Sequence, residues 1–171
     1  MALMLGRRKR RDNDTSQAPE DVYRGLRKLA LNSVANGLAP PPVDHPGVSG
    51  VVVDIPAQGG FATVVALTDG TTSMYTSTGG GTIGAGTHAT VAAATHKLLS
   101  AVQSQLASFQ RDDDEELPAA GSVRFHVLAP TGSHCEDVPE DSFWGRAPHQ
   151  LMPVIASTQE LVTAMREASA Q

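Results

Sequence analysis

The sequence contains a single cysteine and no long apolar run, and each of these features excludes a class of protein. Because a lone Cys135 cannot form a disulfide within the chain, it is typical of a reducing compartment and predicts a cytoplasmic protein. No apolar stretch reaches the ~18 residues of a membrane-spanning helix, so we expect no transmembrane segment. Hydrophobic residues make up 40% and charged residues 18% of the 171 residues, a balance that is typical of a globular domain.

The basic side chains are unevenly distributed. Five of the 13 Lys and Arg residues lie in Arg7–Arg11, and the rest of the chain is acidic. We predict a disordered basic arm over residues 1–18 and a single α+β domain over residues 19–171. Two interpretations of the arm remain open, a solvated tail or a salt-sensitive contact with an anionic surface such as lipid or nucleic acid.

The sequence of the first half of the domain predicts one helix and three strands. The helix spans residues 19–37, because Pro19 suits a first helical position and Asn36-Gly37 ends the apolar periodicity. Its apolar stripe consists of Val22, Leu26, Leu29, Ala30 and Ser33. Strands follow at residues 51–53, 61–67 and 71–76, and we expect the first of them to end at Asp54.

Two turn signals connect these strands. Asp69-Gly70 is a strong hairpin signal, and Gln58-Gly59-Gly60 predicts a second hairpin. The three strands therefore form an antiparallel meander.

A long helix is predicted from Thr87 to Gln110. Its apolar residues recur at spacings of three and four, which requires the helix to pack on the sheet. They are Val91, Ala94, Leu98, Val102, Leu106 and Phe109. An acidic connector at 111–120 follows, and we interpret its charges as solvated.

The second half predicts a strand over residues 122–128, a turn at Thr131-Gly132 and one more strand before Pro139. Residues 139–156 form a Pro-rich loop with a short strand at 151–155, and a capping box at Ser157 and Glu160 begins the last helix. The predicted fold is α+β, a single antiparallel sheet with one long central helix and flanking N- and C-terminal helices.

The glycine-rich segment 79–86 has the Gly-x-Gly-x-x-Gly spacing of a dinucleotide-binding loop. The preceding strand already belongs to a hairpin, whereas that fingerprint requires a parallel neighbour. Two interpretations of the segment therefore remain. It is either a tight connection between strand and helix, or a small-ligand or anion site at the helix N-terminus. The residues of this candidate site are Gly81, Gly84, Gly86, Thr87 and His88.

The six histidines have no metal-ligand spacing, so we predict no metal and no cofactor. His126 and Cys135 can face each other across the turn, which leaves open a Cys–His nucleophile pair with hydrolytic activity. The alternative is a buried cysteine that fills apolar space.

The segment Phe143-Trp144-Gly145-Arg146 holds the only tryptophan. Tryptophan and arginine are enriched at interaction hot spots, so Phe143, Trp144 and Arg146 are candidate partner-binding residues. The other interpretation is a loop that packs Trp144 beneath itself.

The order of elements resembles the roadblock/LC7 group within the profilin-like architecture. The resemblance covers residues 20–130 and rests on the strand opening Val-Ser-Gly-Val-Val-Val-Asp at 48–54, on Ala92-Ala93-Ala94 and on Leu98-Leu99. It implies a non-catalytic homodimer that binds small GTPases or holds larger complexes together. The chain is otherwise similar to bacterial proteins that have no assigned activity.

We therefore predict a non-enzymatic cytoplasmic interaction or regulatory module that binds a protein partner or self-associates. The alternative is a small-ligand or anion-binding protein that uses the glycine-rich loop.

Overall fold

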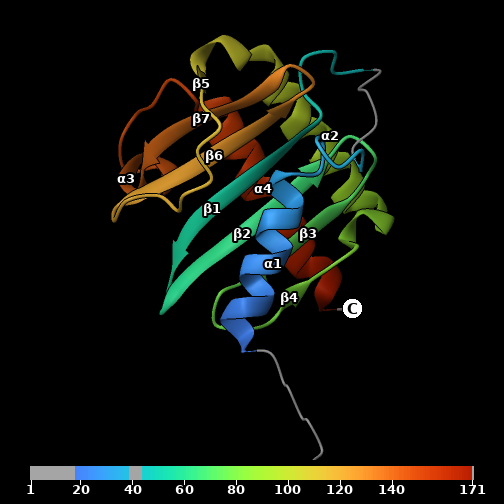
Figure 1. The fold of residues 1–171 in the computed structure, drawn as a ribbon. Helices are drawn as coiled ribbons and strands as arrows, with labels where there is room; N and C mark the ends of the chain where they lie inside the picture. Colours follow the sequence, from blue (N-terminus) through green and yellow to red (C-terminus); the bar gives the residue numbers. More distant parts are fainter. Residues whose placement is uncertain (1–17, 39–43, 171) are drawn as a thin grey trace, which may run out of the picture.

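The computed structural model describes residues 18–38 and 44–170, so residues 1–17 of the predicted basic arm lie outside them. One antiparallel sheet has the strand order β4-β3-β2-β1-β6-β7-β5, which confirms the predicted α+β fold (Figure 1). The strands are β1 Gly50–Ala57, β2 Gly60–Leu67, β3 Thr72–Thr76, β4 Gly81–Thr82, β5 Gln110–Arg111, β6 Ser122–Ala129 and β7 Gly132–Pro139. The helices are α1 Pro19–Leu31, α2 Ala89–Ser104, α3 Glu140–Phe143 and α4 Met152–Ser169, with 3₁₀ turns η1 Ala85–Thr87 and η2 Leu106–Ser108.

The predicted meander of β1, β2 and β3 is confirmed. β1 pairs with β2 from Gly50↔Leu67 to Ala57↔Gly60. β2 also pairs with β3, and the turn at Asp69-Gly70 connects these two strands. Gly70 has a φ of 89°, a conformation that only glycine adopts without strain. The two hairpins place β1 in the middle of the sheet beside β6.

The two faces of the sheet are covered by different helices. α2 and α4 pack together on one face, whereas α1 crosses the other face alone (Figure 1). Because side chains alternate along a strand, Val53 faces α2 and α4 while its neighbours Val52 and Asp54 face α1. The predicted apolar stripe of α2 packs on the sheet as expected.

α2 is shorter than predicted at both ends. The segment before Ala89 forms the 3₁₀ turn η1, and His88 is extended with a ψ of 128°. After Ser104 the chain turns through η2 and becomes extended at Phe109, so that Gln110 pairs with Cys135 in the sheet. Strand pairing therefore replaces the last helical turns.

The prediction of an irregular loop over residues 139–156 was correct only for residues 144–151. Residues Glu140–Phe143 form α3, and α4 begins at Met152 in place of the predicted strand. Pro153 lies in the first turn of α4, where its missing N–H costs no hydrogen bond. Ser157 is only 4% exposed inside α4, so the predicted capping box does not begin the helix.

α1 ends at Leu31 instead of Gly37, and the face that it buries matches the predicted stripe only in part, at Leu26 and Ala30. Val22 and Leu29 are 43% and 52% exposed, whereas Tyr23 is 3% exposed. The helix is rotated so that Tyr23 and Arg27 reach polar groups of the sheet.

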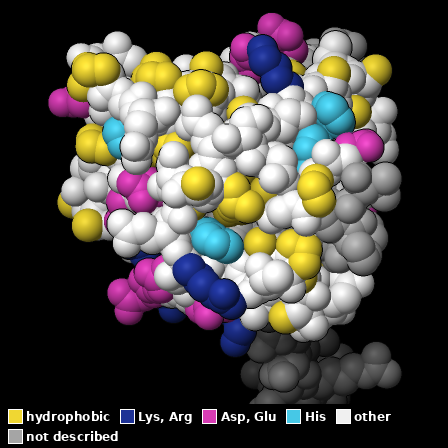
Figure 2. Space-filling view, turned by 90° about the horizontal axis from the view of Figure 1, so that it is seen from above, with side chains coloured by type: hydrophobic (Ala, Val, Ile, Leu, Met, Phe, Trp, Pro, Cys, Tyr) yellow, Lys and Arg dark blue, Asp and Glu magenta, His cyan; other side chains and the backbone are white. Residues whose placement is uncertain are grey.

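The surface is mixed in character. On the end of the molecule that Figure 2 shows, hydrophobic side chains form small groups among polar ones, and basic side chains lie beside acidic ones. This texture is ordinary for a globular domain. None of the helices in the described ranges is long and apolar enough to cross a bilayer.

Candidate functional site

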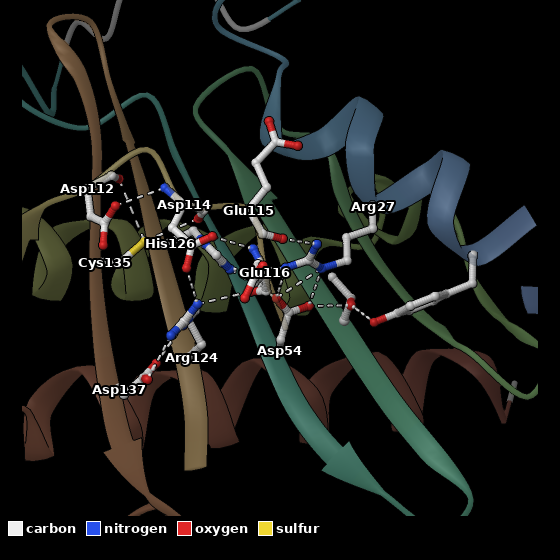
Figure 3. A network of polar contacts seen from close by, with 12 residues as sticks. Arg27, Asp54, Asp112, Asp114, Glu115, Glu116, Arg124, His126, Cys135 and Asp137 are labelled. Carbon is white, nitrogen blue, oxygen red and sulfur yellow. Dashed lines mark hydrogen bonds and ion pairs between the residues drawn. The ribbon is translucent and has the colours of Figure 1, made fainter. Parts of the chain in front are cut away.

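A cluster of polar side chains lies between α1 and the sheet (Figure 3). It contains Asp54 from β1, His126 from β6 and Cys135 from β7, with Arg27 reaching down from α1. Asp54 is fully buried and His126 is 2% exposed. The expectation that β1 would end at Asp54 was therefore wrong, because this carboxylate is paired inside the sheet.

The carboxylate of Asp54 accepts hydrogen bonds from three neighbours. Arg27 donates from Nη2 at 2.7 Å and from Nε to both oxygens at 3.1 Å. Thr63 Oγ1 donates at 2.7 Å, and His126 Nε2 lies 3.0 Å from Oδ2. Burial by itself would raise the pKa of Asp54, but the hydrogen bonds from His126, Arg27 and Thr63 and the charge of Arg27 outweigh it and lower that pKa.

Cys135 and His126 face each other across the β6–β7 hairpin, as the sequence suggested. They are paired in register, and Cys135 Sγ lies 3.2 Å from His126 Nδ1. His126 Nε2 in turn contacts Asp54. The order of thiol, imidazole and carboxylate is that of a nucleophilic triad.

The surroundings of Cys135 oppose its action as a nucleophile. Burial and the nearby carboxylate of Asp112 raise the pKa of the thiol to about 12, and the charges of Asp114 and Asp137 act in the same direction. Because the thiolate is the reactive form, a thiol with this pKa stays protonated and unreactive at neutral pH. The side chain is also only 8% exposed.

The acidic connector passes over this cluster with its backbone, while most of its charged side chains are exposed, as predicted. Arg27 donates to the backbone carbonyls of Glu115 and Glu116 at 2.5 and 3.2 Å. Arg124 pairs with Asp114 at 2.9 Å and with Asp137 at 2.7 Å, which raises the pKa of Arg124 (Figure 3). The two arginines therefore hold the connector over the thiol, and the cluster acts as a structural core of the α1 face.

We expect Cys135 to react with Ellman's reagent at pH 7.5 at least roughly a thousandfold more slowly in the native protein than in urea. The reason is that a thiol whose pKa is raised from 9.0 to about 12 has about a thousandth of the thiolate of an ordinary cysteine at this pH. Stopped-flow absorbance measures both rates. A native rate within tenfold of the unfolded rate would show an activated thiol and contradict the structural interpretation.

The glycine-rich loop forms a tight crossing between strand and helix. Gly84 has a φ of 73°, and a Cβ on Gly86 would lie 1.9 Å from the backbone oxygen of Gly70. Thr87 N–H donates to Gly84 O, and His88 N–H donates to Ala85 O. These bonds occupy two of the amides that an anion could bind, and Gly84 N–H donates to Ser73 Oγ at 3.4 Å, so the geometry favours the crossing over an anion cradle.

The other two residues of that candidate site are separated, because Gly81 lies in the sheet whereas His88 lies at the start of α2. Gly81 belongs to β4, opposite Tyr75. His88 precedes the first residue of α2 and makes no side-chain capping bond. The loop nevertheless contributes Ile83, which is 70% exposed, to a cavity under α1.

The predicted partner-binding segment lies on α3 and the turn after it. Phe143 is 1% exposed and contacts Phe125 in the core, with ring centroids 6.3 Å apart, so its ring is not on the surface. Trp144 is 49% exposed and meets Phe143 edge to face at 4.9 Å. Arg146 pairs with Asp141 at 2.8 Å in an exposed ion pair.

An apolar groove of about 490 Å³ lies beside Trp144. Ile55 and Met74 line it from the sheet, and Val162 and Arg166 line it from α4. Gln159 supports this wall, because its side-chain amide donates to the backbone carbonyl of Phe143. The groove therefore presents an exposed indole, an apolar floor and one cation.

Comparison of the chain with family models, with curated proteins and with solved structures gave no match. Within residues 18–38 and 44–170, no group of three or more His, Cys, Asp or Glu side chains is placed to hold a metal ion. The Arg27–Asp54 pair was missed at the level of the sequence. Its only signal is an aspartate inside a β-branched run, which is unusual for a buried strand.

Proposed function

We propose that the chain is a non-catalytic interaction module that binds a protein partner through the groove beside Trp144. The observation that carries this proposal is the half-exposed indole above an apolar groove. Tryptophan and arginine are the side chains most enriched at interaction hot spots, where they fill or border desolvated pockets. The unreactive environment of Cys135 supports a binding function over hydrolysis.

The proposed occupant is a peptide segment with an apolar side chain next to a carboxylate, and the chemistry of the groove supports this choice. Ile55, Met74 and Val162 fit an apolar side chain, and Arg166 at the same groove is complementary to an acidic group. A second copy of the chain fits less well, because the protein carries a net charge of −5 and copies repel each other. Small GTPases remain one class of partner, by the resemblance to the roadblock/LC7 group.

The experiment is a selection of peptides from a displayed random library against the full chain, with removal of peptides that also bind a Trp144→Ala variant. We expect the selected peptides to share an apolar residue next to Asp or Glu. Trp144→Ala is expected to weaken them at least tenfold and Arg166→Gln about threefold, measured by fluorescence polarisation. Met152→Ala is the matched control, since Met152 is 37% exposed on α4 and does not line the groove.

Three outcomes would contradict the proposal. The library can yield no peptide that distinguishes the wild type from Trp144→Ala, or the selected peptides can be basic. The third is a wild-type dimer that dissociates in Trp144→Ala, measured by sedimentation, because the occupant would then be a second copy.

A further inference from the structure

A cavity of about 290 Å³ lies between α1 and the β2–β3 part of the sheet. Its apolar walls come from α1 through Leu26 and Ala30 and from β2 through Val65. Leu29 and Ile83 also line it and are 52% and 70% exposed, so the cavity opens to solvent beside them. It lies on the face opposite α2 and α4, away from the Trp144 groove.

Two residues that line this cavity carry buried hydroxyl groups without a partner among the described residues. Ser33 is 1% and Tyr75 5% exposed, and among the described residues neither Ser33 Oγ nor Tyr75 OH has a hydrogen-bond partner. By contrast, the neighbouring hydroxyl of Tyr23 is bonded to Thr63 at 2.9 Å. An unsatisfied buried hydroxyl is costly, so two in the wall of one cavity point to a ligand that bonds them.

The electrostatics of the cavity favour an uncharged ligand with an acceptor. Burial and the nearby charge of Asp54 raise the pKa of Tyr75, so its phenol stays protonated and acts as a donor. The same charge opposes an anion at this place. A carbonyl oxygen has two lone pairs and can accept from both hydroxyls.

The volume limits the size of the ligand. At about 30 Å³ per water-sized group, a cavity of about 290 Å³ holds roughly ten non-hydrogen atoms. We propose that this cavity binds a small, neutral, mainly apolar molecule whose single carbonyl or ether oxygen accepts hydrogen bonds from Tyr75 and Ser33. This site is independent of the groove beside Trp144.

The test uses 2-octanone as the probe and follows the methyl resonances of Leu29, Val65 and Ile83 by NMR on the full chain. We expect saturable shifts at these methyl groups with a dissociation constant below about 1 mM, within the range that ligands of this size reach. Tyr75→Phe and Ser33→Ala are each expected to weaken binding about fivefold, because each removes one hydrogen bond. Octanoate, which has the same chain length and a negative charge, is expected to bind at least tenfold more weakly.

The melting temperature of each variant shows whether a loss of binding comes from a loss of folding. Because Tyr75→Phe removes an unpartnered buried hydroxyl, its melting temperature should equal or exceed that of the wild type. Val22→Ala is the matched control for α1, since Val22 is 43% exposed and does not line the cavity. The proposal is overturned by shifts confined to the Trp144 groove, by no saturable shift up to 5 mM (about five times the expected limit), or by equal affinity of Tyr75→Phe, Ser33→Ala and the wild type.

Discussion

Replacement of Asp54 by alanine is expected to lower the free energy of unfolding by about 3–5 kcal/mol, as measured by urea denaturation. The substitution leaves the guanidinium of Arg27, which is 11% exposed, without its buried counter-ion. It also removes the acceptor for Thr63 and the partner of His126 Nε2. The loss is large because an uncompensated buried charge costs more than the pair contributed.

Two further variants test whether the loss of stability in Asp54→Ala comes from leaving a buried charge without its partner. Glu160→Ala breaks an ion pair with Lys97 in which both side chains are more than half exposed, so we expect a change below about 1 kcal/mol. The double variant Arg27→Met with Asp54→Ala is expected to recover part of the lost stability, since no charge is then stranded. If Asp54→Ala costs no more than Glu160→Ala, the buried network does not stabilise the α1 face.

The contribution of Asp54 also depends on pH. Its pKa is lower in the folded protein than its ordinary value of 3.8, so the stabilisation is present at neutral pH. It is lost as the pH falls below this value and through the folded pKa. The difference between the wild type and Asp54→Ala should therefore shrink in acid.

Gly86→Ala is expected to destabilise the fold by about 1–3 kcal/mol or more, as seen in a lower urea midpoint. A Cβ at this position would lie 1.9 Å from the backbone oxygen of Gly70, and neither backbone can move without disturbing the β2–β3 hairpin. The close approach is therefore part of the fold and does not require a bound anion.

Substitutions at two other glycines serve as references for the loss of stability expected in Gly86→Ala. At Gly84 a Cβ meets no atom within 4 Å but the φ is 73°, so Gly84→Ala should cost about 1 kcal/mol through backbone strain. Gly25 lies inside α1 with open space around it, and Gly25→Ala should stabilise by about 0.5–1 kcal/mol. A Gly86→Ala protein as stable as the wild type would contradict the tight crossing.

Local signals predicted the central hairpins and the packing of α2, and both are present. Asp69-Gly70 defines a turn with its own backbone requirements, and the spacing of Val91, Leu98 and Val102 defines one helix face. These features depend on residues close together in the sequence, which is why the sequence alone was sufficient.

The predictions that were wrong share a physical cause, because they depend on contacts between residues far apart in the sequence. Arg27 and Asp54 are 27 residues apart, so their pairing, with Arg27 on the inner face of α1 and Asp54 inside β1, has no local signal. Pro153 was placed in a short strand within a Pro-rich loop, although the first turn of a helix tolerates proline equally well. The predicted turn at Thr131-Gly132 allowed His126 and Cys135 to face each other, whereas the backbone of the acidic connector above the thiol could be seen only in the fold.

The most direct test of the proposed binding function uses the emission of Trp144, the only tryptophan in the chain. Titration with a selected apolar–acidic peptide should shift this emission to shorter wavelength, because the half-exposed indole becomes desolvated. The shift should saturate at the same dissociation constant that polarisation gives. Binding by polarisation without any change in the emission of Trp144 would place the peptide elsewhere and contradict the proposed function.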